Sequence, residues 1–526
     1  MITLLRCSTV VLMLLTVLSA QSLDVSLERT TSHKDWGTGW DTIFVLQNGI
    51  VTLAAVPKIG GRVMQYDLGT NASIYIHGEY KGKVPPDGNA MVGGFRMLPS
   101  PQADFGWPSP PALDLNPYTC TVVASSADSA AIELTSSIEN STDAKYAKHK
   151  GLQFKRRITL YKASTRVKVE MTMLNKGQQQ LQHGIWDITQ TACGNNDCWA
   201  YFQRNPSSSL GGGKGFVQYM GESASAAAAA EAATQWKPDA APGGIMGVQY
   251  LKKVGKIGAD CKAGWICFND RTTRYAYVKT FTWRNGETYP DSGASVQVYT
   301  YDDTYNMIEV EVLGPLVNLG PGDSTTLTEE WFAARASGTV LDINSAGLIT
   351  RKLTVQEQNE GITVTGTYGV FQPGKVYARF IGTDGNPVST ADSFTVKPDD
   401  SLQMSGTYTV PPGVNRLQLQ AYSTGGVLVG ILDSAAVPVT GVRFDNRQKL
   451  LSAPLHTITP SGITLYEVEP ATVTMHTLTG RILASHRVIP GDAMTVPFTG
   501  YRGTCIVTIA RPSGTVSIPV PAVTVR

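Results

Sequence analysis

The chain has few charged residues and no long basic stretch. Of its 526 residues only 16% are Asp, Glu, Lys or Arg, and 44 Lys and Arg against 42 Asp and Glu leave a formal net charge of +2. Basic residues stand together only in short groups, such as Lys252-Lys253 and Arg156-Arg157. Because binding to nucleic acid requires a clustered basic surface, nucleic acid is not expected as a partner.

Long apolar runs are absent beyond the N-terminus, so no transmembrane segment is expected. The run from Val10 to Leu18 follows Arg6 and precedes the small pair Ser19-Ala20. It is about half the length of the roughly 20 apolar residues that span a bilayer. This pattern is typical of a signal peptide over residues 1–20, cleaved after Ala20. We therefore expect an exported protein that is secreted or held at the cell surface.

Cysteines are also few, with seven in the whole chain, and Cys7 would leave with the signal peptide. In an exported protein the close pairs Cys193/Cys198 and Cys261/Cys267 predict disulfides, either within each pair or across the two loops. Zinc is the alternative. Neither spacing is that of a C-x-x-C motif and no His lies near either pair, so neither a metal nor another cofactor is expected.

Turn-forming and strand-forming residues are abundant, with 52 Gly, 29 Pro and 21 Tyr, which predicts an all-β protein. The pair Asn48-Gly49 separates the apolar runs Ile43 to Leu46 and Ile50 to Val56, a pattern that indicates a hairpin. The nearly all-Ala stretch from Ser223 to Ala233 is the one strong helix former, inside a Gly- and Ser-rich insertion.

The length of the chain and its changes of texture predict several folded parts. Residues 24–345 have the pattern of one large antiparallel unit. Residues 351–440 repeat strand-length runs with turns about every dozen residues, which indicates an immunoglobulin-like sandwich, with a simple spacer as its plainest role. We expect residues 441–464 to be a linker and residues 465–526 to form a small β-sandwich.

The last part has a recognisable sequence pattern. A strand from Val473 to Met475 runs into Thr479-Gly480-Arg481, and a second strand follows at Cys505 to Ile509. This resembles the C-terminal sorting domain of the type IX (Por) secretion system, although Cys505 stands where that family usually has Tyr. The resemblance implies the secretion machinery as a partner. One more small sandwich without that role is the alternative.

The large unit also resembles a known family. The apolar strand from Val51 ends in the turn Gly60-Gly61, the segment Gly151 to Leu160 precedes Val167 to Gly177, and His183-Gly184-Ile185-Trp186-Asp187-Ile188 follows. Together with Gly93 to Gln102, these segments resemble galactose-mutarotase-like proteins and an uncharacterised mutarotase-like family. The resemblance implies a large antiparallel β-supersandwich that binds carbohydrate.

Two glutamates provide the candidate base of such a site. Glu309 and Glu311 are two residues apart, so on a strand both point to one face, and apolar residues such as Val310 occupy the other. Aldose epimerases of the resembled family use a carboxylate base and an imidazole acid. The resemblance therefore implies catalytic roles for Glu309 or Glu311 as the base and for His183 as the acid.

The other candidate residues would bind the sugar. We expect Arg96 to donate to hydroxyl groups and Trp107 or Trp186 to stack on the apolar face of the ring. One departure weakens the enzymatic interpretation, because the second active-site His of galactose mutarotases is missing from the segment around Gly93-Gly94. His77 lies upstream and is a possible substitute.

These observations favour a secreted carbohydrate-binding protein. An active aldose epimerase, or another carbohydrate-active enzyme that uses His183 and Glu309, is the first alternative. A non-catalytic structural protein of the cell surface is the second.

Overall fold

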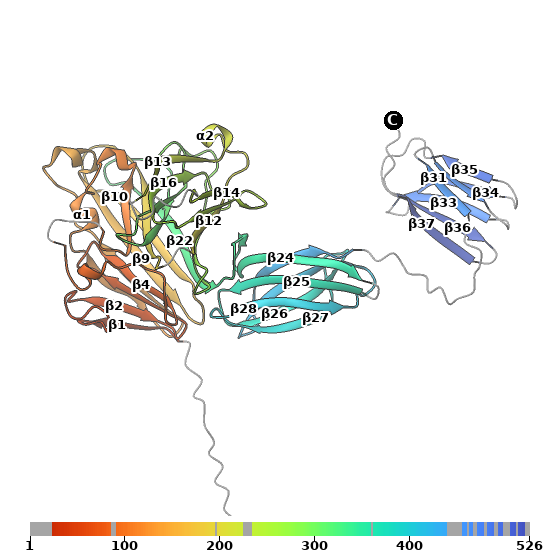
Figure 1. The fold of residues 1–526 in the computed structure, drawn as a ribbon, viewed down its shortest axis with the longest axis horizontal. Coiled ribbons are helices and arrows are strands. Elements are labelled where there is room, and N and C mark those ends of the chain that lie inside the picture. Colours follow the sequence, from red (N-terminus) through yellow and green to blue (C-terminus); the bar gives the residue numbers. More distant parts are fainter. Residues whose placement is uncertain are drawn as a thin grey trace, which may run out of the picture. The chain divides into compact units, whose positions relative to one another are not determined.

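The structure, a computed structural model, describes residues 24–85, 91–194, 197–224, 234–358 and 361–438, together with strands between 455 and 520. Nearly all of its regular elements are antiparallel strands, which confirms the predicted all-β class (Figure 1). The chain divides after residue 439 into two compact units. The helices in the described ranges are short, and none has the length and apolar character needed to cross a bilayer. The predicted signal peptide lies outside the described residues.

Two large sheets make up most of the first unit. Twelve strands form one sheet, which contains from edge to edge β1 (Ser26–Thr30), β2 (Ile43–Gln47), β3 (Val51–Val56), β4 (Arg62–Leu68), β6 (Phe95–Ser100), β11 (Leu181–Ala192), β20 (Met307–Leu313), β19 (Val296–Thr300), β16 (Lys253–Ala259) and β13 (Phe216–Ala224), with β5 (Asn71–Ala72) beside β4 and β21 (Val317–Leu319) beside β11. Ten strands form the other: β14 (Trp236–Ala241), β15 (Ile245–Gln249), β12 (Cys198–Gln203), β17 (Trp265–Asp270), β18 (Tyr275–Phe281), β22 (Ser324–Arg335), β10 (Val167–Asn175), β9 (Leu152–Tyr161), β8 (Ser129–Thr135) and β7 (Thr119–Ser125).

Short helical turns lie in the connections between these strands. They are η1 (Gly78–Tyr80), η2 (Gln102–Asp104), α1 (Pro111–Asp114), η3 (Ala144–His149) and α2 (Leu210–Gly213). The predicted helix from Ser223 is not formed at its first two residues, because Ser223 and Ala224 end strand β13. The rest of that Ala-rich stretch lies outside the described residues.

The predicted hairpin at Asn48-Gly49 is confirmed, since β2 pairs antiparallel with β3. Gly49 has a φ of +76°, a conformation that glycine adopts without steric cost. The Asn48 side chain accepts hydrogen bonds from the backbone N–H groups of Ile50 and Val51, at 3.1 and 3.0 Å. Local turn chemistry therefore sets the register between β2 and β3.

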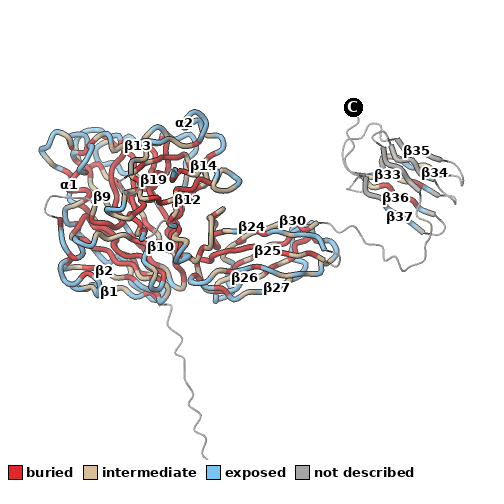
Figure 2. Tube along the Cα trace, viewed as in Figure 1, coloured by how far each residue is buried: buried red, intermediate tan, exposed pale blue. Residues whose placement is uncertain are grey.

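One apolar core fills the space between the two large sheets. Its residues are among those coloured red, for buried, in Figure 2. At its centre the fully buried Trp331 of β22 meets the ring of Phe95 on β6 edge to face, with ring centroids 4.6 Å apart. Tyr277 of β18 and Tyr66 of β4 pack around the same indole at 5.6 and 6.0 Å. Because these rings come from both sheets, their packing fixes one sheet against the other.

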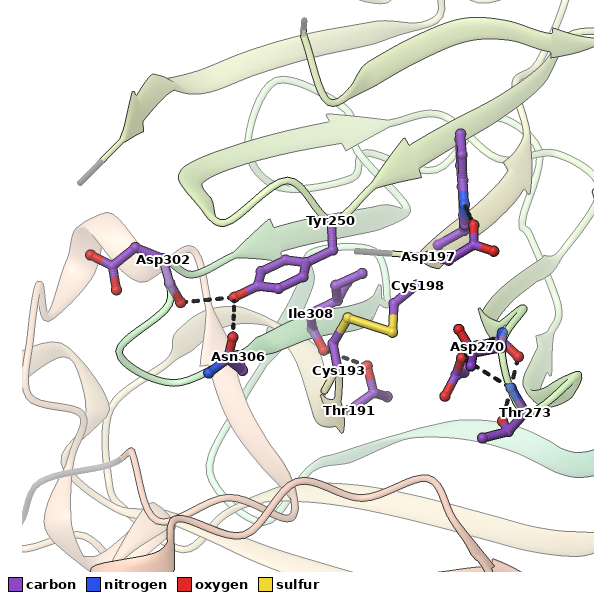
Figure 3. The surroundings of a disulfide bond; sticks show 12 residues. Thr191, Cys193, Asp197, Cys198, Tyr250, Asp270, Thr273, Asp302, Asn306 and Ile308 are labelled. Atoms are coloured by element: carbon purple, nitrogen blue, oxygen red, sulfur yellow. Dashed lines mark hydrogen bonds between the residues drawn. A yellow bond between two sulfur atoms is a disulfide. The ribbon is translucent and has the colours of Figure 1, made fainter. Parts of the chain in front are cut away.

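A disulfide joins Cys193, just after β11, to Cys198, the first residue of β12 (Figure 3). It therefore closes the point where the chain passes from the twelve-stranded to the ten-stranded sheet. This confirms one predicted pair. The second pair was wrong, because Cys261 and Cys267 are buried free thiols. Burial raises the pKa of Cys261 to about 11, so this thiol stays protonated and packs as a small apolar group.

Two smaller sheets complete the first unit. One contains β23 (Asp342–Ile343), β24 (Gly347–Gln358), β25 (Gly361–Val370) and β28 (Ser401–Tyr408), and the other contains β27 (Pro387–Val396), β26 (Gly374–Gly382), β29 (Val414–Ser423) and β30 (Leu428–Ala436). They enclose an apolar core of their own, with Val364, Phe380 and Leu417 among its buried residues.

The second unit has a three-stranded and a four-stranded sheet. The first contains β31 (Leu455–Thr459), β32 (Gly462–Tyr466) and β35 (Ala493–Pro497), and the second β34 (Ile482–Val488), β33 (Ala471–Thr477), β36 (Cys505–Arg511) and β37 (Gly514–Val520). Strand β31 lies inside residues 441–464, which were expected to be a linker, so the paired strands begin near residue 455. Thr479 and Gly480 of the predicted turn lie outside the described residues.

Candidate functional site

Successive side chains of strand β20 point alternately into the apolar core and to the opposite face of the sheet, where the candidate site lies. Ile308, Val310 and Val312 are fully buried in the core between the two large sheets. Glu309 and Glu311 therefore lie on the opposite face of the twelve-stranded sheet, as the sequence predicted.

The pairing of neighbouring strands places other polar residues beside the two glutamates. Glu311 is opposite Gln297 of β19, and Glu309 is opposite Gln190 of β11. Ile188 of β11 is opposite both Glu311 and Arg96 of β6. Directly paired residues project from the same face of a sheet, so these polar side chains share one surface. Five residues on it form what we call the polar row: Arg96, Gln190, Gln297, Glu309 and Glu311.

Asp114, at the end of α1, holds Arg96 in place. The fully buried Asp114 carboxylate accepts hydrogen bonds from Arg96 Nη1 at 3.2 Å, Arg62 Nη2 at 2.9 Å and Ser109 Oγ at 2.5 Å. Burial alone would raise the pKa of Asp114, but the two guanidinium groups outweigh it and hold this pKa below its usual value. Asp114 is therefore ionised and anchors both arginines.

The Gly60-Gly61 turn permits this arrangement. Both glycines have positive φ, +61° and +58°. A Cβ on Gly60 would lie 1.8 Å from the backbone oxygen of Asp114, closer than any side chain can approach. The turn that the sequence predicted from its two glycines therefore brings α1 against the start of β4.

Glu309 is tied to its neighbours. Gln190 Nε2 donates to Glu309 Oε1 at 2.6 Å, and Arg96 Nη2 lies 3.9 Å from the same oxygen. Arg96 thus links Asp114 to Glu309, and the guanidinium sits between two carboxylates.

Glu311 is fully buried and contacts a polar and a charged side chain that Glu309 does not contact. Its Oε2 accepts a hydrogen bond from Trp186 Nε1 at 2.7 Å, and Lys256 Nζ of β16 lies 3.2 Å from the same oxygen. Burial raises the pKa of Glu311 to about 7, with Lys256 lowering it and the nearby Glu309 raising it further. This carboxyl group therefore exchanges its proton near neutral pH.

Four atoms of the polar row have unused hydrogen-bonding capacity. Each is buried and has no hydrogen-bond partner among the described residues; they are Arg96 Nε, Gln190 Oε1, Gln297 Oε1 and Glu311 Oε1. Arg96 Nε is a donor and the two glutamine oxygens are acceptors, whereas Glu311 Oε1 accepts when ionised and donates when protonated. The four atoms come from four adjacent strands. Buried polar atoms are normally paired, so such a group indicates a place for a ligand with hydroxyl groups or for ordered water.

The two candidate tryptophans differ in access. The Trp107 side chain is 44% exposed, and the Arg96 guanidinium carbon lies 5.1 Å from its ring centroid. Trp186 is only 3% exposed and packs in an apolar cluster with Leu98 and Phe105. Trp107 is therefore open for stacking. Trp186 instead donates its indole N–H to Glu311, so the expected stacking role does not fit its burial.

His183 lies away from the glutamates. Its Nε2 donates to the backbone oxygen of Lys148 at 2.9 Å, and its ring stacks on His149 with centroids 4.8 Å apart. On β11 the partner of Glu311 is Ile188, five residues beyond His183. That is a backbone distance of about 16 Å at a rise of about 3.3 Å per residue. The structure does not bring the predicted acid to the predicted base.

His77, the possible substitute, lies in a cluster of aromatic rings. It packs against Tyr80 and Tyr305, with centroids 5.0 and 5.3 Å away. Tyr305 contacts Tyr301, which contacts Tyr299, the partner of Glu309 on β19. His77 is therefore connected to the polar row through three rings and not by direct contact.

Asp187 faces the other side of β11, toward the ten-stranded sheet. Its carboxylate forms a fully buried ion pair with Lys279 of β18, which also donates to the Val310 backbone oxygen at 3.0 Å. Burial and the nearby Asp187 raise the pKa of Glu329, which lies beside this pair, well above its usual value. These groups connect the two sheets and are separate from the polar row.

The sequence did not single out Gln190, Lys256 and Gln297, or the anchoring role of Asp114. The three site residues lie on strands far apart in the sequence, and only the strand pairing brings them beside Glu309 and Glu311. Alternation within each strand was the available signal, but it does not identify which strands are neighbours.

Comparisons with known proteins concern the fold. No family model and no curated protein matches the chain. Solved structures similar to it include a galactose mutarotase-like protein from Clostridium acetobutylicum (11% identity, 60% of this chain and 100% of that chain, TM-score 0.39). A putative aldose 1-epimerase from Klebsiella pneumoniae (11%, 60% and 84%, 0.40) and a putative mutarotase from Salmonella typhimurium (11%, 56% and 90%, 0.37) are also similar. At these values the likeness does not transfer a function to this chain.

The raised pKa of Glu311 predicts a pH-dependent stability. The native state keeps the proton between pH values of about 4.5 and about 7, where the unfolded chain releases it, so wild-type stability falls as pH rises through this window. Glu311→Gln has no titrating carboxyl group at this position, so it lacks this pH-dependent contribution to the free energy of unfolding. We expect the variant to gain up to about 3 kcal/mol relative to wild type between about pH 5 and about pH 8, at about 1.4 kcal/mol per pKa unit.

Urea unfolding followed by tryptophan fluorescence measures this difference, since all nine Trp lie between Trp36 and Trp331. Glu133→Gln, which removes a half-buried carboxylate of β8 that pairs with Lys155, is the control and should gain no stability relative to wild type as the pH rises. If the free energies of unfolding of wild type and Glu311→Gln differed by the same amount at both pH values, this would contradict the raised pKa of Glu311.

Proposed function

We propose that the polar row, with Trp107 beside it, binds carbohydrate. The observation that carries this proposal is the set of four buried polar atoms without partners among the described residues, a mixture of donor and acceptor groups on adjacent strands. Sugar hydroxyl groups both donate and accept hydrogen bonds, so they complement such a mixed set. The exposed Trp107 ring supplies the apolar surface on which the C–H face of a sugar ring stacks.

The charges of the site support a neutral ligand. Arg96 is matched by Asp114 and Glu309, and Lys256 is matched by Glu311. No unmatched positive charge remains in this set to attract a phosphate or carboxylate. A neutral sugar satisfies the free hydrogen-bonding atoms without adding a buried charge, whose transfer from water is costly.

Calorimetry against mono-, oligo- and polysaccharides tests the proposal. Trp107→Ala removes the stacking surface from an exposed position, so the chain should fold and its affinity should fall about tenfold, or about 1.4 kcal/mol. Trp199→Ala, in the ten-stranded sheet, is the matched control and should bind like wild type. No binding to any carbohydrate, or equal losses in both variants, would refute the proposal.

Aldose epimerisation is a second candidate function, favoured by the pKa of Glu311 near 7. An ionised Glu311 would take the proton of the anomeric hydroxyl while Lys256 gives a proton to the ring oxygen and the bond from that oxygen to the anomeric carbon breaks; closure reverses both transfers. Lys256 and Arg96 are the donors nearest to the glutamates, and His183 has its Nε2 engaged with Lys148. Glu311 would be the central group.

Polarimetry of freshly dissolved aldoses measures this activity. We expect the rate to rise as pH increases through about 7, because the base must be ionised. Glu311→Gln should lose at least about 100-fold, whereas His183→Ala should retain the rate. Loss of the rate in His183→Ala with an unchanged Glu311→Gln would reverse these roles, and no catalysed rate at all would leave carbohydrate binding as the function.

We further propose that the chain is exported through its N-terminal signal peptide and that its last part is a sorting domain. The Val473 to Ile509 pattern supports this role. The immunoglobulin-like interpretation of residues 351–440 is part of the same proposal for an extracellular protein. Deletion of residues 440–526, the second compact unit, tests the sorting role separately from carbohydrate binding.

This deletion should cause the protein to accumulate in the periplasm while it binds carbohydrate as strongly as the full chain. Cell fractionation with immunoblotting measures the location, and calorimetry on the purified deletion variant measures binding. Unchanged secretion would contradict the sorting role. Loss of binding would show that the second unit contributes to the site.

A further inference from the structure

The sheet formed by β27, β26, β29 and β30 has a polar and aromatic outer face. On β26, Val376, Ala378 and Phe380 enter the core of the sandwich, and on β29 Leu417, Leu419 and Ala421 do the same. The alternating residues therefore project outward. We call them the tyrosine face; they are Lys375, Tyr377, Arg379, Arg416, Gln418, Gln420 and Tyr422.

Tyr377 and Tyr422 form the centre of this face, with Arg379 beside them. The two rings meet edge to face with centroids 5.4 Å apart. The Arg379 guanidinium carbon lies 5.2 Å from each ring centroid. Its Nε is buried and has no hydrogen-bond partner among the described residues. The guanidinium is thus held at a fixed place by two rings while a donor remains unused.

Two amides extend the row along β29. Tyr422 donates from its hydroxyl to Gln420 Oε1 at 3.3 Å, and Gln420 Nε2 donates to Gln418 Oε1 at 3.1 Å. Gln420 is opposite Tyr377 and Gln418 is opposite Arg379 across the strand pair. A cavity of about 550 Å³ opens at the tyrosine end, lined by Lys375, Tyr377, Arg379, Thr395, Tyr422 and Thr424.

The charge of this face has one sign. Lys375, Arg379 and the exposed Arg416 at the start of β29 form no salt bridge in the described part of the chain. The register places Thr390, Ser393 and Thr395 of β27 and Leu428, Ile431 and Ser434 of β30 beside the tyrosine face. None of these is a carboxylate. The cations are therefore unmatched, in contrast to those beside Glu309 and Glu311.

We propose that the tyrosine face binds an anionic polysaccharide, a chain built of uronic acids. Uronate carboxylates complement the three unmatched cations, and a guanidinium held in a fixed orientation suits a planar carboxylate. The tyrosine rings offer stacking surface to the sugar rings, and the two glutamine amides can pair with hydroxyl groups. This site is independent of the polar row and gives the second sandwich a role beyond that of a spacer.

Calorimetry with the full chain tests this inference with two matched ligands. Polygalacturonate is the anionic probe, and the same polymer fully methyl-esterified lacks the charges. We expect binding to polygalacturonate that weakens with salt and is at least about tenfold weaker for the esterified polymer. Equal affinity for both polymers would overturn the proposal.

Variants locate the binding. Arg379→Ala and the double variant Tyr377→Ala/Tyr422→Ala should each lose at least about tenfold in affinity for polygalacturonate. Lys397→Ala removes a cation from another part of the same sandwich, where Lys397 pairs with Asp399, and should bind like wild type. Trp199→Ala, on β12 and in neither proposed site, should also bind like wild type.

Equal losses in Arg379→Ala and Lys397→Ala would show unspecific attraction and overturn the site. If Trp107→Ala lost affinity for polygalacturonate while Arg379→Ala bound it fully, the polymer would bind at the polar row. That result would also overturn the site. Single-stranded DNA is the competing anion, since cations and aromatic rings also suit it. Tighter binding of DNA than of polygalacturonate through Arg379 would refute the carbohydrate assignment.

Discussion

The candidate site depends on a single buried carboxylate. Asp114 holds Arg62 and Arg96 at once, and it occupies its place only because Gly60 lets the backbone of α1 approach β4. Removing one partner of such a buried group is costly, since it leaves the other charge unpaired. Arg96, fixed at one end, reaches Glu309 at the other. The position of Arg96 beside Glu309 therefore depends on Asp114.

The twelve-stranded sheet serves two purposes with its two faces. Its inner face builds an apolar core with the second large sheet, stabilised by aromatic packing around Trp331 and by the Asp187–Lys279 pair. Its outer face presents acids, amides and cations that are mostly satisfied by one another. The few atoms left over are what distinguishes a site from a solvated surface, and the matched charges explain why a neutral ligand fits there. The tyrosine face differs in both respects, because its cations are unmatched.

The sequence predicted much of the fold but less of the site. The Asn48-Gly49 hairpin, the alternation in β20 and the Cys193–Cys198 disulfide each depend on residues close together in the chain, and all three are present. The pairing of Cys261 with Cys267 failed because proximity in sequence does not set the direction of side chains. The predicted pairing of His183 as the acid with Glu311 as the base failed for a related reason, since strand register places His183 far from Glu311. Gln190, Lys256 and Gln297 were missed because the register between strands distant in sequence cannot be read from the sequence.

A bound sugar would complete the hydrogen bonds of the polar row. A crystal structure of the full chain in complex with a bound saccharide tests it most directly. We expect sugar hydroxyl groups within about 3.2 Å of Glu311 Oε1 and Gln297 Oε1, with Arg96 still held by Asp114 and the Trp107 ring against a sugar face. A saccharide bound elsewhere, with these atoms paired to other protein groups, would contradict it.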